Sequence, residues 1–259
     1  MASTTTRARA DFAGPGGEGR SRTAIVVGAA GRMGTLVRSE LLARGFDVVA
    51  GYDADNVAEL DEGAPAVDVV VDFSAPAATA HVVAYAGRTG AAVVSGVTGL
   101  SGAQLAQLAE LGETNRVVWS SNYSLGVAAL RRATAMVAAA LPGWDVEIVE
   151  THHNKKADAP SGTAKALLAA VDPGGERPVV DGRSGQVGPR PAGEIGMHAL
   201  RGGTVAGTHE VHFFGTDEEL CLTHRAASRQ IFVAGAVACA ERLLAMPVGY
   251  YDFDALMFG

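Results

Sequence analysis

Short apolar, β-branched runs alternate with helix-forming segments from Thr23 to Ser120, and this alternation constrains the fold more than any other feature of the chain. The runs read TAIVVG, DVVAGY, VDVVVDF, AAVVSG and RVVWS, and helical spacing of apolar residues follows the first. A helix is expected after VDVVVDF, with Ser74 as its N-cap and Pro76 in its first turn. Strands that alternate with helices form a parallel, doubly wound sheet of the α/β class.

The pattern changes after Asn122, and this change predicts a second domain. An Ala-rich helix is expected over 125–141, followed by the strand WDVEIVE and a helix over 163–171. Three further strand-like runs and a last helix complete the pattern, at 195–200, 204–214, 219–225 and 228–246. Successive strands with tight links indicate a mixed sheet, so we expect an α+β domain beside the Rossmann-type one.

These patterns give a division of the chain into a tail and two domains. Residues 1–22 are polar and rich in Gly and Arg and lack the apolar segment of a secretory signal, so we expect a disordered tail. An organelle transit peptide is the weaker alternative. The expected dinucleotide-binding domain comprises 23–122 with 230–259, and the expected substrate-binding domain comprises 123–229.

Composition excludes several classes of function. The chain has 259 residues, 48% hydrophobic and 19% charged, which suits one large or two modest cores. A net charge of −7 argues against a nucleic-acid partner, although a local cationic pocket can still bind a small anion. No apolar run reaches the ~20 residues that cross a bilayer, so no membrane partner is expected. Cys221 and Cys239 are expected to be buried thiols in the reducing cytoplasm.

The segment VVGAAGRMG places Gly28, Gly31 and Gly34 between a strand and a helix. It departs from the dinucleotide fingerprint because Ala30 occupies the middle-glycine position. Small residues still let the backbone approach a pyrophosphate at the N-terminus of the helix. Asp53 follows the next strand at the distance expected for an acid that binds ribose hydroxyls. A dinucleotide site is favoured, and a packing turn in a nucleotide-free protein is the alternative.

The segment ETHHNKKADAPSGTA follows a strand predicted to close at Glu150, so it is expected to form a loop at the carboxyl end of that strand. Open α/β sheets carry their chemistry at this edge. His152 can donate a proton near neutral pH, and Lys156 supplies positive charge. The Ser-Gly-Thr at 161–163 opens a helix whose free N–H groups can hold a carboxylate. The loop can therefore hold an anionic substrate and protonate it.

Three simpler interpretations compete with this one. The two histidines and Asp158 could bind a metal, but no further residue stands at a usual ligand spacing, so no metal site is predicted. The lysine pair could be a solvated surface run. Thr163 could be a helix cap, which is compatible with anion binding.

The segment ETHHNKKADAPSGTA resembles the signature of the dihydrodipicolinate reductase family. Other segments agree with that family in the same order, namely GAAGRMG, DFSAP, SGVTG, SSNYSLG, RGGTVAGTHEVHFFG and HRAASRQIFVAGA. The resemblance covers nearly everything from Thr23 to the C-terminus. It implies an NAD(P)H-dependent reductase of 4-hydroxy-tetrahydrodipicolinate in diaminopimelate and lysine biosynthesis, assembled as a homotetramer through the sheet of the second domain.

The resemblance also implies roles for individual residues. His152 corresponds to the proton donor and Lys156 to the catalytic lysine beside it. The dicarboxylate would be held by His153, Lys156, Ser161, Gly162 and Thr163. The cofactor would be held by Gly28, Ala29, Ala30, Gly31, Arg32, Met33, Asp53, Gly96, Val97, Thr98, Ser120, Ser121, Asn122 and Tyr123. The other histidines are expected to be structural, with a functional role open for His209.

Two other functions remain as alternatives, a related NAD(P)-dependent dehydrogenase and a non-catalytic dinucleotide sensor. For the reductase, NADH is the expected preferred cofactor and NADPH the second. Asp53 can accept hydrogen bonds from ribose hydroxyls and repels a 2′-phosphate, and Ala54 and Asp55 add no positive charge nearby. Arg32 is the one neighbouring cation in the turn that can reach such a phosphate.

Overall fold

The first of two β-sheets is parallel throughout. The computed structural model describes residues 21–259, so the predicted tail lies almost wholly outside the described residues. Six strands run in the order β11-β5-β4-β3-β1-β2. Their bounds are β1 Arg22–Val27, β2 Phe46–Tyr52, β3 Val69–Asp72, β4 Ala92–Ser95, β5 Arg116–Trp119 and β11 Gly249–Tyr251.

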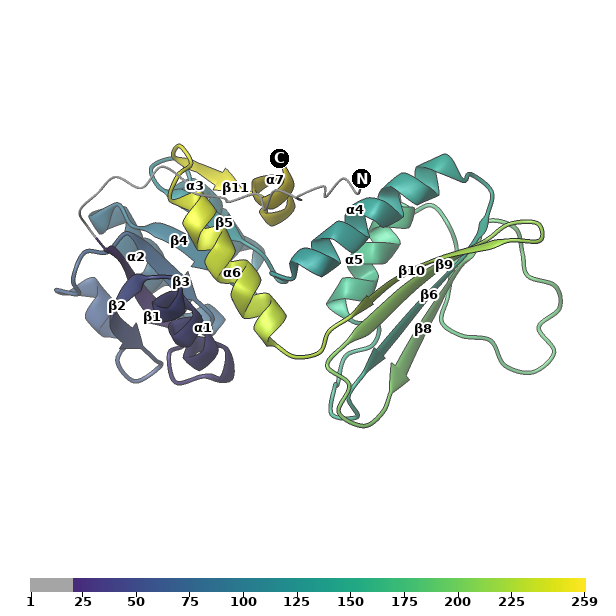
Figure 1. Ribbon diagram of the computed structural model, residues 1–259, viewed down its shortest axis with the longest axis horizontal. Helices are drawn as coiled ribbons and strands as arrows, with labels where there is room; N and C mark the ends of the chain where they lie inside the picture. The colour runs from purple at the N-terminus through teal and green to yellow at the C-terminus, as the bar shows by residue number, and fades with distance from the viewer. Residues whose placement is uncertain (1–20) are drawn as a thin grey trace, which may run out of the picture.

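Helices cover both faces of this sheet, as Figure 1 shows. One apolar core joins it to α1 (Arg32–Ala43) and α6 (Gln230–Leu243). A second core joins it to α2 (Thr79–Thr89) and α3 (Gly102–Leu111). Central strands enclosed on both sides are apolar throughout, which explains the continuous VVV of β3. The predicted doubly wound α/β sheet is confirmed, and the strand order reverses between β1 and β3.

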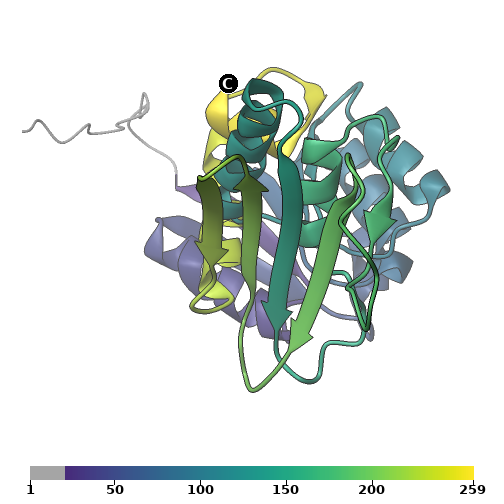
Figure 2. The ribbon, with the colours of Figure 1, turned by 90° about the vertical axis from the view of Figure 1, so that its right-hand side faces the viewer.

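The second sheet is mixed, as predicted. Its order is β10-β9-β6-β8-β7, with β6, β7 and β8 parallel and β9 antiparallel to both its neighbours. The bounds are β6 Asp145–His152, β7 Val179–Val180, β8 Ile195–Arg201, β9 Thr208–Phe214 and β10 Glu219–Arg225. Two helices, α4 (Leu125–Ala140) and α5 (Gly162–Val171), pack on the face that looks toward the first sheet. Figure 2 shows the other face, which no element of the described chain covers.

The chain crosses between the sheets twice. It enters the second sheet through α4 and returns after β10 into α6, then adds β11 and α7 (Phe253–Phe258) to the first sheet (Figure 1). The sequence pattern did not predict β11 or α7, because a three-residue strand and a six-residue helix carry almost no periodic signal. Short 3-10 turns lie at Val57–Asp61 and Pro76–Ala78.

Two predictions about helix starts are wrong. Ser74 does not cap a helix, because its hydroxyl donates 2.5 Å to Oδ1 of Asp72, and Ala75 stands at the N-cap instead. Thr163 is not a cap either, since Ser161 accepts the hydrogen bond from the N–H of Ala164. In the first case the carboxylate of Asp72, two residues before Ser74, takes the serine hydroxyl. In the second case the hydroxyl of Ser161, two residues before Thr163, accepts the hydrogen bond from the helix.

Two further predictions need correction. The strand β6 continues to His152, two residues beyond its predicted end, so His152 lies on a strand and not in a loop. Cys239 is buried as predicted, but Cys221 is exposed. Strand alternation places Cys221 on one face of the second sheet, and that face is the uncovered one.

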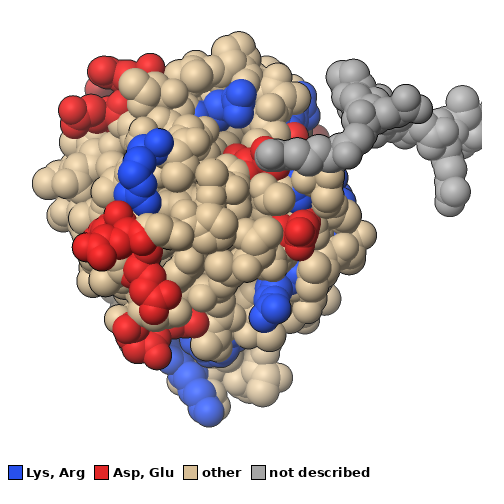
Figure 3. All heavy atoms as spheres, turned by 90° about the vertical axis from the view of Figure 1, so that its left-hand side faces the viewer, with Lys and Arg blue, Asp and Glu red and all other residues tan. Residues whose placement is uncertain are grey.

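The surface carries acidic and basic side chains unevenly. Figure 3 shows the left-hand side of the molecule in Figure 1, where acidic groups gather along one edge and basic groups stand apart. No helix between residues 21 and 259 has the length and apolar character required to span a bilayer.

Candidate active site

The glycine turn after β1 leaves no room for side chains. Gly28 has φ +80°, and a Cβ there would lie 2.8 Å from the carbonyl oxygen of Phe73. A Cβ on Gly34 would lie 2.0 Å from the carbonyl oxygen of Gly28, so the first turn of α1 presses directly on the turn. The N-cap of α1, Gly31, has no side-chain cap, and the first turn holds no acid. The N–H groups of this helix start are therefore available to an anion.

Asp53 lies against the same turn. Its carboxylate oxygens accept hydrogen bonds from the backbone N–H of Ala30 at 3.1 and 3.0 Å. Arg32, the first residue of α1, follows this turn directly in the sequence, and its side chain is exposed. The predicted ribose acid and the predicted glycine turn are thus one structural unit, with the carboxylate fixed beside the helix start.

The other predicted cofactor segments follow β4 and β5, so they lie at the same carboxyl edge of the parallel sheet. Gly96 faces the ring of Phe73, whose Cε1 would lie 2.3 Å from an added Cβ. The carbonyl of Val97 accepts a hydrogen bond from the indole of Trp119 at 2.8 Å. Thr98 and Ser121 are exposed, and Gly96 and Ser120 are partly so.

Tyr123 differs from the rest of this set. Its side chain is fully buried, donates a hydrogen bond to the carbonyl of Ser95 at 2.8 Å, and packs edge-on against Phe253. Burial raises the pKa of its phenol well above the ordinary value. The side chain therefore supports the first crossing between the sheets, and the carbonyl of Tyr123 packs on Gly235 of α6, where an added Cβ would lie 1.8 Å from it.

Glu150 lies at the centre of the second group of predicted residues. Its carboxylate is fully buried and accepts hydrogen bonds from both terminal nitrogens of Arg201 at 2.8 Å and from the N–H of Ser161 at 3.0 Å. Oε2 also lies 2.5 Å from Nδ1 of His152. Burial alone would raise the pKa of Glu150, but the hydrogen bonds from Arg201 and His152 outweigh it and hold that pKa below its usual range.

This contact sets the orientation of His152. With Nδ1 donating to Glu150, the other ring nitrogen, Nε2, is the one available for proton exchange. A Cβ on Gly207 would lie 3.1 Å from Nε2, so the absence of a side chain there keeps the nitrogen accessible. The imidazole retains 12% of its surface exposed.

The start of α5 completes the group. Ser161 caps the helix, and the first N–H groups, those of Gly162 and Thr163, have no partner within a helix. The amide of Asn122 donates a hydrogen bond of 3.0 Å to Oγ1 of Thr163. A predicted cofactor residue and a predicted substrate residue are therefore in direct contact across the gap between the two sheets.

Lys156 and His153 lie in the loop that joins β6 to α5. Nζ of Lys156 lies 2.7 Å from Oδ1 of Asp158, a carboxylate that is 60% exposed. Nδ1 of His153 is buried without a hydrogen-bond partner among the described residues. Lys156 can therefore exchange its solvated partner Asp158 for an anion. His153 has a ring nitrogen whose hydrogen bond is not yet made.

His209 and His224 extend the site further than expected. Nε2 of His209 lies 3.2 Å from Oγ of Ser161, and its ring packs edge-on against that of His152 at 5.1 Å. Burial, followed by the charge of His152, lowers the pKa of His209 to about 4. His224 lies 6.4 Å from His209, and burial lowers its pKa too. His209 is therefore neutral near pH 7 and fixes the cap of α5.

Comparisons with known proteins agree on the family. The model for the N-terminal part of dihydrodipicolinate reductase matches residues 23–123, and the model for its C-terminal part matches residues 126–257. The 4-hydroxy-tetrahydrodipicolinate reductase of Natronomonas pharaonis is 41% identical over 244 residues, covering 89% of this chain and 98% of the relative. The chain belongs to the dihydrodipicolinate reductase family. The enzyme of that name from Akkermansia muciniphila is 40% identical over 90% of this chain and 96% of its own.

The fold agrees with a solved dihydrodipicolinate reductase. Dipicolinate-bound dihydrodipicolinate reductase from Paenisporosarcina sp. TG-14 superposes with a TM-score of 0.72 at 21% identity, covering 90% of this chain and 98% of that one. A scyllo-inositol dehydrogenase from Lactobacillus casei with bound NAD(H) superposes less closely, with a TM-score of 0.54 at 12% identity. The two-sheet architecture is thus shared by dihydrodipicolinate reductases and more distant dehydrogenases.

Two residues of this dihydrodipicolinate reductase site received no role from the sequence. In the sequence Glu150 is marked only as the end of a strand, and Arg201 only as the first residue of RGGTVAGTHEVHFFG. In the parallel pair β6–β8, Arg201 stands beside His152, and in the antiparallel pair β6–β9, His209 stands beside Glu150. An acid two residues before His152 is the only signal available in the sequence, because side chains at i and i+2 share a face of a strand.

Proposed function

We propose that this chain reduces 4-hydroxy-tetrahydrodipicolinate to tetrahydrodipicolinate with a nicotinamide dinucleotide as hydride donor, in diaminopimelate and lysine biosynthesis. Its relatives across the full length bear this enzyme's name. The observation that carries the proposal is the buried Glu150, which holds the imidazole of His152 beside the start of α5. The proposed proton donor on β6 and the proposed anion seat at the start of α5 are thereby held by one carboxylate.

The substrate is a cyclic dicarboxylate, and the start of α5 suits one of its carboxylates. The N–H groups of Gly162 and Thr163 donate to it, and the helix dipole favours its charge. Lys156 leaves Asp158 to pair with it, and His153 offers its vacant Nδ1. The second carboxylate and the ring then extend from α5 toward the carboxyl edge of the first sheet.

The reduction needs a proton at the ring. Loss of water from the hydroxylated ring leaves a conjugated imine, which then gains one hydride and one proton. Nε2 of His152 gives that proton as negative charge develops, and Glu150 stabilises the imidazolium before transfer. Solvent returns the proton to the exposed edge of the imidazole. Neutral His209 places no second positive charge beside it.

The residues around the glycine turn fit a nicotinamide dinucleotide. Gly28 and Gly34 leave space that side chains would fill, the helix α1 starts without a cap, and Asp53 is fixed beside it. When bound, the cofactor supplies the hydride. The segments after β4 and β5, with Asn122 at their end, would hold its nicotinamide half next to Thr163.

A coupled assay tests the function. Oxidation of NADH should depend on the product of the preceding synthase, and His152→Ala should lower kcat at least 100-fold while the cofactor Kd stays unchanged. Oxidation that proceeds on another carbonyl substrate alone would favour a related dehydrogenase. Cofactor binding without turnover would favour a sensor.

Cofactor preference follows from the charge around Asp53. We propose that NADH is preferred and NADPH accepted, because Asp53 and Asp55 repel a 2′-phosphate and Arg32 offers the counter-charge. Ala54→Arg should shift the ratio of kcat/KM values toward NADPH about tenfold, since one charged hydrogen bond contributes about 1.5 kcal/mol. An NADPH preference in the unmodified protein would contradict the role given to Asp53.

We further propose a cytoplasmic homotetramer that assembles through the second sheet. The support is its uncovered face and the large apolar side chains exposed on this sheet and its loops, namely Val179, Val187, Leu200, Val205, Phe214 and Leu220. Exposed apolar surface of this kind marks interfaces. A monomer by light scattering at micromolar concentration would overturn the assembly.

A further inference from the structure

The side chain of Asn122 joins the two halves of the proposed reductase site. Asn122 lies in the segment that follows β5, and its amide meets Oγ1 of Thr163, at the start of α5, at a distance of 3.0 Å. Both side chains are half-buried. The family resemblance groups Asn122 with the cofactor, yet its side chain contacts a residue proposed to hold the substrate. The direction of this hydrogen bond decides what Thr163 can offer to a carboxylate.

A backbone amide fixes that direction. The N–H of Ser124 lies 2.8 Å from Oδ1 of Asn122, and a backbone N–H can only donate. The oxygen of the side-chain amide must therefore face Ser124, and its nitrogen must face Thr163. It follows that Nδ2 of Asn122 donates and that Oγ1 of Thr163 accepts.

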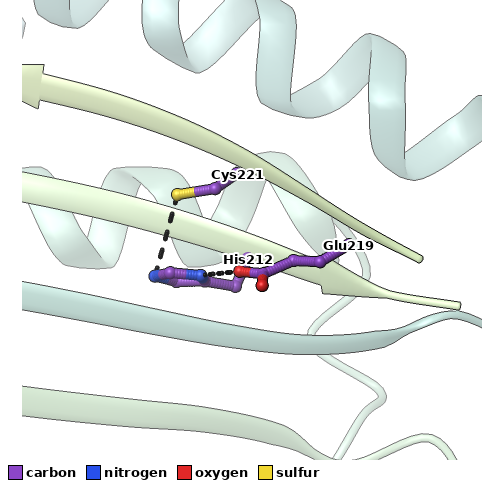
Figure 4. A group of neighbouring side chains, drawn as sticks. All are labelled: His212, Glu219 and Cys221. Carbon is purple, nitrogen blue, oxygen red and sulfur yellow. Dashed lines mark hydrogen bonds and ion pairs between the residues drawn. The ribbon is translucent and has the colours of Figure 1, made fainter. Parts of the chain in front are cut away.

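Contacts between two side chains often leave this direction open. Figure 4 shows His212, Glu219 and Cys221 on the uncovered face of the second sheet, where Nε2 of His212 lies 3.8 Å from Sγ of Cys221. Which of those two atoms donates depends on the tautomer of the ring. Asn122 has no such freedom, because neither a backbone N–H nor a carboxamide gains or loses a proton near pH 7.

The hydroxyl of Thr163 is left with one hydrogen to donate. A hydroxyl has one O–H and two lone pairs, and one lone pair accepts from Asn122. Within residues 21–259 this hydroxyl has no acceptor for its own hydrogen. Thr163 is the second residue of α5 and follows the exposed Gly162. Its O–H can therefore join the free N–H groups of the helix start as a further donor to one carboxylate.

We propose that Asn122 is a positioning residue for the substrate carboxylate and acts through the hydroxyl of Thr163. This role rests on the proposed function and adds a donor to the anion seat. The backbone of Asn122 is fixed in turn by Ser120, whose hydroxyl donates to its carbonyl at 2.8 Å and accepts from its N–H at 3.2 Å. A segment expected to hold the nicotinamide half thus also orients a group that faces the substrate.

Binding of dipicolinate, pyridine-2,6-dicarboxylate, to the full-length protein saturated with NADH tests this role by calorimetry. Asn122→Asp keeps the acceptor for Ser124 and replaces the donor by a carboxylate, which takes the hydrogen of Thr163 and repels an anion. The Kd of dipicolinate should rise about 100-fold, and the KM of the substrate should rise more than kcat falls. The Kd of NADH should change by less than about threefold, because the side chain of Asn122 faces α5.

Asn154→Asp is the matched control. It adds the same charge to the exposed part of the loop between β6 and α5, and it should raise the Kd of dipicolinate by less than about threefold. An equal loss in both Asp variants would trace the effect to charge alone and overturn the role of Asn122.

A double-mutant cycle tests whether Asn122 acts through the hydroxyl. Asn122→Ser keeps an acceptor for the N–H of Ser124 but cannot reach Thr163, and Thr163→Val removes the hydroxyl. Each should raise the Kd of dipicolinate about tenfold, and the double variant should lose no more than Thr163→Val alone. Thr163→Ser keeps the hydroxyl and should bind within about threefold of the unmodified protein.

Two further results would overturn this role. They are additive losses in the double variant, and a Kd of NADH that rises in Asn122→Asp while that of dipicolinate does not. The proposed function would survive either result, because turnover in the coupled assay and dipicolinate binding by the unmodified protein do not require Asn122 to act in this way. An unmodified protein that binds no dipicolinate would overturn the anion seat itself. Circular dichroism establishes that each variant folds.

Discussion

The two sheets each hold a buried carboxylate near the carboxyl end of a central strand, and the two carboxylates have opposite electrostatic settings. Asp72 ends β3 with 1% of its surface exposed, and Glu150 lies near the end of β6 with none exposed. Asp72 accepts hydrogen bonds from the N–H and hydroxyl of Ser74. No cationic side chain pairs with Asp72 within residues 21–259, whereas Glu150 pairs with Arg201 and His152.

The difference shows in the direction of the pKa. Burial raises the pKa of Asp72 to about 6, and the hydrogen bonds from Ser74 only reduce that effect. For Glu150 the same penalty of burial is outweighed by the guanidinium and the imidazole, so its pKa is lowered. Position at a strand end therefore does not determine the charge of a buried acid. Its hydrogen-bond partners do, and here they make one carboxylate a fixed charge and the other a titrating group.

Removing the cation beside Glu150 should have the largest effect. Arg201→Met leaves a buried carboxylate without its main partner, so the free energy of unfolding in urea should fall by about 3–5 kcal/mol, and kcat should fall with it. Adding Glu150→Gln to this variant should recover part of the stability but not the turnover. Arg44→Met, which removes exposed ion pairs with Glu40 and Glu241, is the control and should cost at most about 1 kcal/mol. Equal losses in Arg44→Met and Arg201→Met would contradict the contrast.

Acid should destabilise the Glu150 region through His209. The pKa of His209 is lowered to about 4 in the folded state, against 6.5 in the unfolded state. Between these two pH values the unfolded chain binds a proton at this histidine that the native protein does not bind. Stability is complete above pH 6.5 and is lost as the pH falls from 6.5 to about 4, by roughly 3 kcal/mol. His209→Gln should remove that part of the pH dependence in denaturant unfolding. Parallel pH profiles for the two proteins would exclude His209 as the cause.

Asp72 should show the reverse sign and the smallest effect. Its folded pKa of about 6 lies above the unfolded 3.8, so stability falls as the pH rises through this interval. Asp72→Asn keeps an acceptor for Ser74 and removes the charge, and it should raise the free energy of unfolding by about 3 kcal/mol at pH 8. At pH 4 the variant and the unmodified protein should have the same stability. An equal gain at both pH values would trace the effect to packing.

Much of the structure on which this comparison rests can be predicted from the sequence, because strands and helices leave periodic patterns of apolar residues. Every strand of the first sheet except β11 was expected within a few residues, and the Gly-containing helix start at 161–163 predicts an anion seat there. The order of residues around His152 predicts it as the proton donor, and that role stays a prediction. Local features of this kind need no knowledge of which distant segments meet.

The remaining features depend on register between distant strands. Arg201 meets Glu150 across 51 positions, and nothing in either segment marks the pair. The alternation of β10 defines two faces, but only the packing of α4 and α5 decides which is covered, and so the exposure of Cys221 was missed. The failure of Ser74 as a cap has a local origin instead, since the buried carboxylate of Asp72, which has no cationic partner among residues 21–259, takes its hydroxyl.

The double crossing between the sheets has a mechanical consequence. The two connecting segments run side by side, since Oγ of Ser124 on the first lies 3.5 Å from Nε2 of His224 just before the second. Two adjacent covalent links permit rotation about the line that joins them and resist twisting or sliding in other directions. Asn122 and Thr163 lie beside the first link, where a rotation produces little displacement, so their hydrogen bond can persist while more distant parts travel far. The hydrogen bond between the two half-sites therefore lies close to the axis of such a rotation.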